Sequence, residues 1–265
     1  MRDMAILVCS CDKYEDVWKP MFEMFYKFWE NCPYNVYLMT NNASFDHPKV
    51  KTLSTGDDIT WSKAFRNALE RIEEDYVLII MEDYILQSKV KNNDFKIALK
   101  YMKNNEIDYF RIFPAPRPTI KYGKCGDFNI GKIEPNAPYR VSLQAAIWKR
   151  EYAISIIDDK DSAWQFEHMG SKRSSRDGSK FISVWDKTPR LMLDYYCTGV
   201  IQGYWIKEAV ELCNKYGVEV DTTRIHIEPF KVRMKRLISV NYLGPIKNVI
   251  KKTKIYDKYR AKKYA

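Results

Sequence analysis

Apolar runs alternate with amphipathic stretches across the first 113 residues, and this alternation restricts the folds open to the chain. Strand-like runs, rich in branched and aromatic residues, occur at 4–10, 35–40, 50–54, 76–81 and 108–113. Stretches with helical spacing of apolar residues lie between them, at 14–32, 59–75 and 92–105. Strands that alternate with helices favour crossover connections and a parallel sheet covered by helices on its faces. The sequence therefore predicts an α/β fold.

The second half of the chain is less regular. Residues 114–140 are dominated by Pro, Gly, Lys and Asn, which predicts a long loop that is functional or mobile. Further strands are predicted at 141–149 and 181–185, and further helices at 150–158 and 205–217. The stretch 162–180 is interpreted as a polar segment containing Trp, Phe and Glu. We expect one domain, residues 1–230, with insertions in its second half.

Composition excludes several protein classes. The 265 residues are 46% hydrophobic and 29% charged, which is typical of a globular protein. No apolar run approaches the roughly 20 residues of a spanning helix, and the start resembles a first strand more than a secretory leader. The six cysteines form no C-x-x-C pair, so a reduced, cytoplasmic setting is expected. The three histidines stand too far apart for a local zinc signature.

Positive charge is concentrated at the C-terminus. The chain carries a net charge of +10, but residues 231–265 hold twelve lysines and arginines against one acid, Asp257. The remainder is therefore close to neutral, and nucleic acid is not an expected partner. The basic tail also carries apolar residues: Ile246, Val249, Ile250, Tyr256 and Tyr259. This mixture favours a helix on an anionic membrane surface; a docked terminal helix, a disordered tail and a polyanion-binding tail are the alternatives.

Two acids, Glu82 and Asp83, follow the apolar run 76–81 directly. A buried charge is costly unless it is paired, hydrogen-bonded or bound to a metal. Ligands of open parallel sheets collect at the carboxyl ends of the strands, so these acids can hold a divalent cation that binds nucleotide phosphates. The alternative is that they cap the next segment or pair with basic neighbours.

The stretch "AFRNALERIEEDYVLIIMED" resembles a segment of family 2 and related GT-A glycosyltransferases, with Arg66 sixteen residues before Glu82. Other elements resemble bacterial surface-polysaccharide glycosyltransferases: "CDKYEDVW", "CPYNVYLMTN", "EDY", "WQFEHMGSKR" and a late "GYW". Together they cover roughly residues 4–221. The resemblance implies a GT-A-like sheet, with a nucleotide-sugar part at 1–113 and an acceptor part at 141–230. The family's third acid is replaced here by Tyr84, which makes Asp83 the expected metal ligand and Glu82 its outer partner.

The resemblance also assigns the donor pocket. Ser10 and Asp12, in the turn after the first strand, are expected to contact the nucleobase or ribose; a plain polar turn is the alternative. Asp57 or Asp58 is expected to read the base, while the other caps a helix. Arg66 is expected at the diphosphate, and an exposed face is its alternative. The donor is expected to be UDP-linked, with Mg²⁺ or Mn²⁺ as the cofactor.

The acceptor side is placed by the same resemblance at residues 162–176. An indole offers a flat apolar surface to a sugar ring, and a carboxylate can act as the base on an acceptor hydroxyl. Trp164 and Glu167 supply these groups, unless they belong to an ordinary surface helix. Lys172, Arg173 and Arg176 are expected to meet a phosphate, such as that of a lipid-linked acceptor.

These expectations describe a glycosyltransferase that acts on a saccharide or lipid-linked saccharide in bacterial capsule or lipopolysaccharide synthesis. It would lie peripherally on the inner face of the cell membrane. A lone late histidine, His226, could add a metal or diphosphate ligand, although such a residue is more often packed or exposed. The alternatives are a non-catalytic nucleotide- or glycan-binding module and a protein that binds polyanions through its tail.

Overall fold

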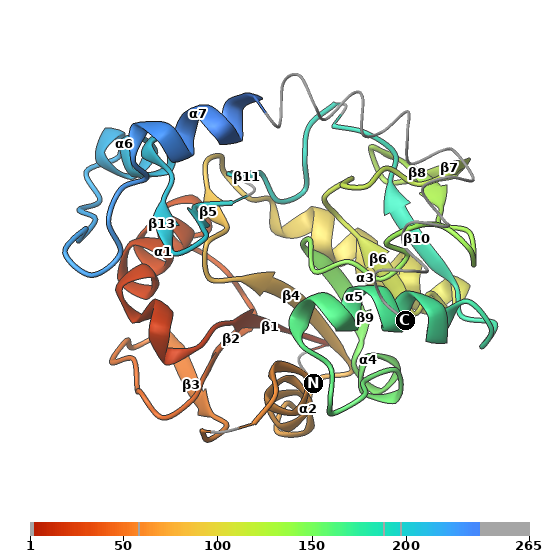
Figure 1. Ribbon diagram of the computed structural model, residues 1–265. Coiled ribbons are helices and arrows are strands. Elements are labelled where there is room, and N and C mark those ends of the chain that lie inside the picture. The colour runs from red at the N-terminus through yellow and green to blue at the C-terminus, as the bar shows by residue number, and fades with distance from the viewer. Residues whose placement is uncertain (1–2, 58, 188, 197, 239–265) are drawn as a thin grey trace.

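The computed structural model describes residues 3–57, 59–187, 189–196 and 198–238. The chain forms a central sheet with helices on both faces (Figure 1). The strands are β1 (Met4–Cys9), β2 (Asn35–Thr40), β3 (Val50–Ser54), β4 (Tyr76–Met81), β5 (Ile85–Leu86), β6 (Tyr109–Arg111), β7 (Ile120–Cys125), β8 (Phe128–Lys132), β9 (Ala146–Lys149), β10 (Phe181–Val184), β11 (Tyr195–Tyr196), β12 (Val200–Ile201) and β13 (Tyr204–Trp205). The helices are α1 (Glu15–Phe28), α2 (Trp61–Glu70), α3 (Asn92–Asn105), α4 (Arg150–Ser155), α5 (Ala163–Ser174), α6 (Lys207–Lys215) and α7 (Phe230–Ile238), with a short 3-10 turn at Asp12–Tyr14.

The main sheet has the strand order β3-β2-β1-β4-β9-β6-β10-β8-β7. Strands β1 to β4 are parallel, as the alternation predicts, so their carboxyl ends meet at one edge. The sheet as a whole is mixed, because β9 runs antiparallel to both of its neighbours, β4 and β6. Its amino end therefore lies at the same edge as the carboxyl end of β4. The predicted α/β class is confirmed.

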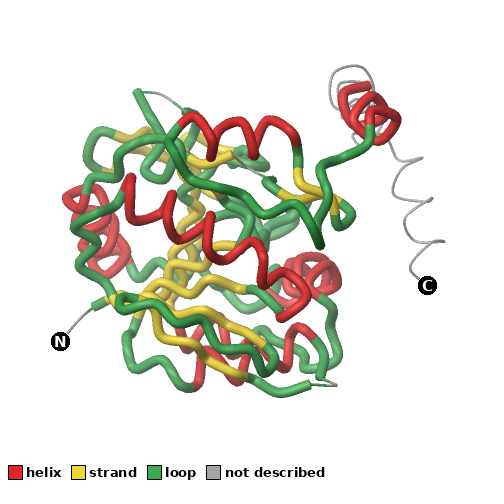
Figure 2. The backbone as a smooth tube through the Cα atoms, turned by 90° about the vertical axis from the view of Figure 1, so that its left-hand side faces the viewer, coloured by secondary structure: helices red, strands yellow, loops and turns green. Residues whose placement is uncertain are grey.

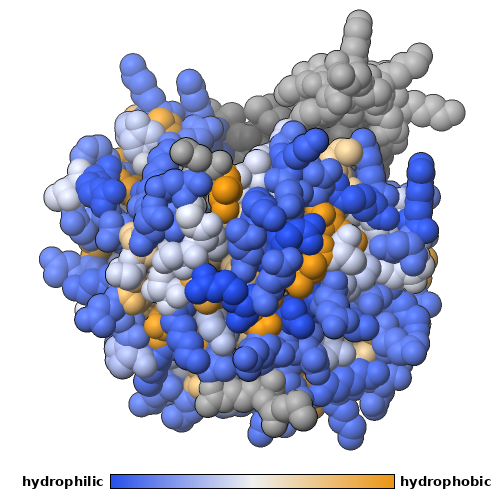
Figure 3. Space-filling model, turned by 90° about the horizontal axis from the view of Figure 1, so that it is seen from below, coloured by the Kyte–Doolittle hydropathy of each residue, from blue (hydrophilic) through white to orange (hydrophobic). Residues whose placement is uncertain are grey.

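The two faces of β1 pack into different cores, because successive side chains of a strand point to opposite faces. Met4, Ile6 and Val8 join the core under α1, α3 and α6. The residues between them join a second core, under α2, α4 and α5. Figure 2 shows the strands enclosed by these helices, and Figure 3 shows a face of the molecule that is mostly hydrophilic outside. β1 is thus a central strand with 0% exposure throughout.

The expectation of an irregular loop over 114–140 was wrong. This segment contains an antiparallel hairpin of β7 and β8 that extends the main sheet through the pairing of β8 with β10. Both ends of the segment are tied to Arg111, which is fully buried at 0% exposure. Its guanidinium donates to the carbonyl oxygens of Pro116, Tyr139 and Arg140 at 2.6–2.8 Å. The hairpin therefore extends from a fixed base.

Two further predictions are corrected by the local structure. The polar stretch after residue 162 is a helix, α5, whose first turn is closed by a capping box of Ser162 and Gln165. The strand predicted from residue 141 begins only at Ala146, and the residues before it run toward the carboxyl end of β4. Both departures matter, because they bring α5 and the segment before β9 close to the carboxyl end of β4.

The first residues of the basic tail belong to α7, which packs against α6 (Figure 1). Arg233 donates to Glu208, and Arg236 donates to both Glu208 and Glu228. The Glu228 side chain is 0% exposed, so its negative charge requires this arginine. The rest of the tail, residues 239–265, for which a membrane-surface helix was predicted, lies outside the described residues. Within the described part of the chain, no helix is long and apolar enough to cross a membrane.

Candidate active site

Glu82 and Asp83 lie at the carboxyl end of β4, the strand at which the parallel part of the sheet meets the antiparallel β9. Glu82 is 8% exposed, and its Oε2 has no hydrogen-bond partner among the described residues. Burial and the neighbouring charge of Asp83 raise the pKa of Glu82 to about 8. The same cause, burial, raises the pKa of Asp83 to about 6. Such a pair of acids is stabilised by a cation placed beside it.

The loop before β12 encloses Asp83. The backbone N–H of Gly199 donates to the Asp83 carbonyl oxygen at 3.0 Å, and that of Val200 donates to Asp83 Oδ2 at 3.3 Å. A Cβ at position 199 would lie 2.8 Å from the Asp83 carbonyl oxygen, so only glycine allows this approach. One oxygen of the Asp83 carboxylate is thus held by the backbone of β12.

Asp12 and Asp57 are brought together at the ends of β1, β2 and β3. The Asp12 carboxylate accepts from the backbone N–H groups of Asn41, Asn42 and Ala43 at 2.8–2.9 Å. Burial opposes ionisation here, but these three N–H groups hold the pKa of Asp12 below its ordinary value. The Asn42 side chain in turn donates to Asp57. Asp12 thus shapes the loop, and Asp57, which is exposed, is the freer of the two to meet a nucleoside.

Ser10 is 7% exposed, and its hydroxyl accepts a 2.7 Å hydrogen bond from Trp18 Nε1. This contact fixes α1 against the loop after β1. Ser10 therefore already has a protein partner. A direct contact between Ser10 and the ribose stays a prediction. Asp58, the alternative to Asp57, lies outside the described residues.

Glu167 projects from α5 toward the segment that precedes β9. Its Oε1 accepts a 2.8 Å hydrogen bond from the backbone N–H of Leu143. Burial raises the pKa of Glu167, while the Leu143 N–H, Ser142 and the charge of Arg111 lower it. A part-exposed carboxylate with a raised pKa suits a general base. Trp164, one turn earlier on α5, is 48% exposed, as a sugar-binding platform requires.

Two of the residues expected at a phosphate, Arg66 and Arg173, have protein partners in the structure, and their phosphate contacts stay predictions. Arg66 donates to Asp159 Oδ1 at 2.6 Å and to the carbonyl oxygens of Ile154 and Ile157. Arg173 donates to Asp161 Oδ2 at 2.6 Å and to one further carbonyl of the same connection. Both guanidinium groups thus brace the α4–α5 connection. Local sequence could not show this, because the partner residues are roughly 10 to 90 positions away.

The other basic residues that were predicted at the site lie at the surface. Lys172, in the last turn of α5, and Arg176, just after that helix, are both exposed to solvent. His226 is also exposed, and its Nδ1 lies 2.9 Å from the Thr222 carbonyl oxygen. Its expected role as a late metal ligand gains no support from this contact. Of the three basic residues expected at an acceptor phosphate, Lys172 and Arg176 are thus the exposed ones.

Within the described part of the chain, the acid pair has few further metal-ligating side chains around it. No cluster of three or more His, Cys, Asp or Glu side chains suited to a metal occurs among the residues that the structure describes. The site instead offers two adjacent carboxylates, one with an unpartnered buried oxygen. Mg²⁺ is commonly bound by one or two carboxylates together with substrate phosphates, so this pair fits a cation that arrives with a diphosphate.

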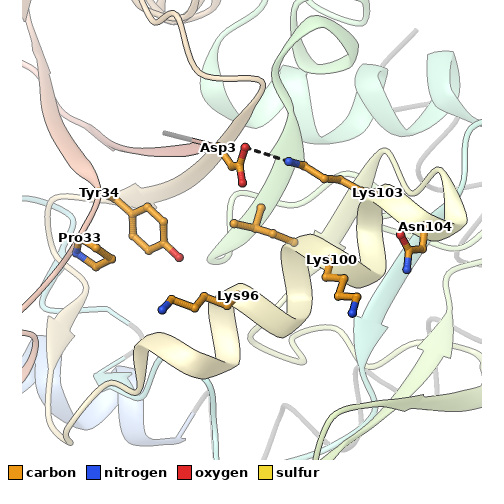
Figure 4. A pocket seen from close by; sticks show the side chains of 8 residues that line it. Asp3, Pro33, Tyr34, Lys96, Lys100, Lys103 and Asn104 are labelled. Carbon is orange, nitrogen blue, oxygen red and sulfur yellow. Dashed lines mark ion pairs between the residues drawn. The ribbon is translucent and has the colours of Figure 1, made fainter. Parts of the chain in front are cut away.

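A hollow of about 350 Å³ lies at the opposite, amino edge of the sheet. Figure 4 shows it lined by Lys96, Lys100 and Lys103 of α3, together with Tyr34 and Asp3. Lys103 is held by Asp3 at 2.9 Å. Because Asp3 precedes β1 and the acids follow β4, this hollow is separate from the candidate site.

Four contributors to the site were missed in the sequence: Ser142, Leu143, Gly199 and Val200. They act through backbone groups or a single hydroxyl, which carry little sequence signal. Gly199 offered the one usable sign, a glycine shortly after the "LDYY" run. Tyr195 was missed as well, and its ring stacks on Tyr84 with centroids 4.3 Å apart.

Comparisons with known proteins found similar folds among solved structures. No family model and no curated protein matches the sequence. A crystal structure of S. aureus TarS 1-349 is similar, with a TM-score of 0.48 at 14% identity over 75% of this chain. The chain spans 61% of that TarS fragment. A Drosophila β-1,4-galactosyltransferase 7 mutant, in complex with manganese, UDP-Gal and xylobiose, has a TM-score of 0.43 at 12% identity, covering 76% of this chain and 72% of that one.

A UDP-glucose pyrophosphorylase complexed with UDP-glucose gives a TM-score of 0.50 at 10% identity. This match covers 82% of the present chain and 99% of the other. At such low identity the likeness concerns the fold alone. The protein has the α/β fold, with a mixed central sheet flanked by helices, that GT-A glycosyltransferases share with sugar nucleotidyltransferases.

Proposed function

We propose that the protein is a glycosyltransferase that moves a sugar from a nucleotide-sugar donor, UDP-linked, to a saccharide acceptor. Asp57 and the loop held by Asp12 would meet the nucleoside. Asp83, with Glu82 beside it, would hold Mg²⁺ or Mn²⁺ on the diphosphate. The cation would neutralise charge that develops on the leaving diphosphate.

In the proposed inverting step, Glu167 accepts the proton of an acceptor hydroxyl. The hydroxyl oxygen forms a bond to the anomeric carbon of the donor sugar, and the bond from that carbon to the diphosphate oxygen breaks. The nucleoside diphosphate leaves with the bonding electrons. Trp164 would pack against the acceptor ring, and Lys172 would meet a phosphate if the acceptor is lipid-linked.

The observation that carries this proposal is the short connection between the acid pair and Glu167. Leu143 donates its N–H to Glu167 at 2.8 Å and accepts a 3.1 Å hydrogen bond from Tyr84, which follows Asp83 directly. The proposed acceptor base and the proposed diphosphate site would thus be joined through two residues, Tyr84 and Leu143. A module that only binds nucleotide has no need for the base.

The test is a donor and product assay. The purified chain is incubated with UDP-, GDP- and CMP-linked sugars, Mn²⁺ or Mg²⁺, and a mixed panel of saccharides. We expect nucleoside diphosphate release that depends on acceptor, with a glycosylated product seen by mass spectrometry. Binding of nucleotide with no release from any donor would favour the non-catalytic module.

A nucleotidyltransferase is the second candidate, favoured by the fold match to UDP-glucose pyrophosphorylase. The turn after β1 argues against it. Residues 10–16, "SCDKYED", contain no glycine, and phosphate cradles made of backbone N–H groups usually need one. Pyrophosphate release from UTP and a sugar 1-phosphate would establish this alternative in the same assay.

A place on the inner face of the cell membrane, in capsule or lipopolysaccharide assembly, is part of the proposal. Its support is the order of the sequence motifs and the basic C-terminus. Because Arg233 and Arg236 are paired with Glu208 and Glu228, membrane attraction must come from the cations beyond them.

Truncation after residue 238 tests the membrane role. This chain keeps α7 and its ion pairs, so it should fold, but it loses most cations of the tail. We expect the full chain to co-sediment with vesicles of phosphatidylcholine and phosphatidylglycerol at low salt and to be released as salt rises. The truncated chain should stay in the supernatant. Equal sedimentation of both would assign the tail another role.

A further inference from the structure

Tyr84 occupies the position at which the glycosyltransferases similar in sequence motifs carry a third acid. In the structure it makes packing and hydrogen-bond contacts inside the protein. Its side chain is turned inward, and the residue is only 5% exposed. Its ring stacks on Tyr195 at a centroid distance of 4.3 Å and an interplanar angle of 13°. Its hydroxyl donates to the carbonyl oxygen of Leu143 at 3.1 Å. Tyr84 therefore extends from the acid pair to the segment before β9.

Leu143 is also hydrogen-bonded to Glu167. The carbonyl that Tyr84 binds and the N–H that Glu167 binds flank the same Cα atom. A hydrogen bond weakens steeply when its angle departs from linearity, so a rotation about the Leu143 backbone alters both bonds. The position of the Tyr84 hydroxyl thus restricts the direction of the N–H that holds the Glu167 carboxylate.

The rest of the segment is anchored around this point. Tyr195 accepts a 3.1 Å hydrogen bond from the Ala145 N–H and donates to Gln144 Oε1 at 2.8 Å. On the other side, Tyr109 donates to the Ser142 carbonyl at 3.2 Å. Leu143 lies between these anchors. Tyr84 holds its carbonyl, and Glu167 accepts from its N–H.

We propose that Tyr84 is a positioning residue for Glu167, acting through the backbone of Leu143. This inference rests on the proposed function, in which Glu167 is the acceptor base. Because Tyr84 follows Asp83 in the chain, movement of the acid pair on donor binding would also move the support of the base. The tyrosine thereby joins the donor half of the site to the acceptor half.

The substitution Tyr84→Phe tests this role, because it keeps the stacked ring and removes only the hydroxyl. We expect transfer to fall about 3- to 10-fold, the rate equivalent of one ordinary hydrogen bond, with donor affinity unchanged. In a Glu167→Gln background the same change should have no further effect, since the residue it positions is already disabled. Tyr26→Phe is the matched control, because its hydroxyl also donates to a carbonyl, that of Lys49 at 3.0 Å, away from the site.

A second readout does not require activity. The amide ¹H–¹⁵N signal of Leu143 should titrate with the Glu167 carboxylate, and Glu167→Gln should abolish that titration. In Tyr84→Phe the midpoint should move to higher pH, because a weaker N–H bond stabilises the carboxylate less. An unchanged midpoint, or an equal loss of transfer in both Glu167 backgrounds, would overturn the proposal. A moved midpoint in a chain without transferase activity would instead overturn the proposed function and leave the positioning role intact.

Discussion

Glu167→Gln is expected to lower glycosyl transfer by about 10²- to 10⁴-fold, the usual contribution of a general base. The amide keeps the size of the side chain, and its oxygen can still accept from the Leu143 N–H, so α5 and the segment before β9 should stay in place. Donor affinity should persist, because the acid pair is untouched. The rate of transfer and the dissociation constant of UDP are the two measurements.

The pH profile sharpens this test. Since burial raises the pKa of Glu167, transfer by the wild type should rise with pH above the ordinary range of a glutamate as the carboxylate loses its proton. The variant should lack that rise when donor and Mn²⁺ are saturating. Glu151→Gln is the matched control, an exposed glutamate of α4 whose substitution should leave the rate unchanged. Near-normal transfer by Glu167→Gln would reassign Glu167 to packing.

Asp83→Asn is expected to weaken UDP binding in the presence of Mn²⁺ by about 10- to 100-fold, the size of effect seen even for residues that only support metal ligands. The asparagine oxygen can still accept from the Val200 N–H, so the enclosing loop should be retained. Glu82→Gln should have a smaller effect, because Glu82 is buried and Asp83 is more accessible. Calorimetry with and without Mn²⁺ measures both.

Protons should compete with the cation at this pair. The pKa of Asp83 is about 6 and that of Glu82 is about 8, so both carboxylates lose their protons between roughly pH 5 and 9. Mn²⁺-dependent UDP affinity should therefore increase as pH rises through this window. Asp127→Asn serves as the control, since that side chain is 78% exposed and far from β4 in the sheet order. Equal affinity of wild type and Asp83→Asn, with and without Mn²⁺, would remove the metal role.

The sequence alone determined the parallel half of the molecule. Strands β1 to β4 and the helices between them were predicted because their apolar residues recur with periods that depend only on near neighbours. The position of the acid pair at the end of β4 was also predicted from neighbouring residues, because Glu82 and Asp83 directly follow an apolar run. The order of these elements also implied that the carboxyl ends share one edge.

The tertiary structure alone decided the second half of the molecule. The antiparallel insertion of β9, the β7–β8 hairpin and the contact of Leu143 with Glu167 depend on pairings between distant residues, for which local periodicity carries no signal. The arginines show the same limit. Arg66 was placed at the diphosphate by its offset from the acids, yet its donors bind a connection roughly 90 residues later. A charged side chain takes the partner that folding brings within about 3 Å, and the spacing along the chain does not specify that partner.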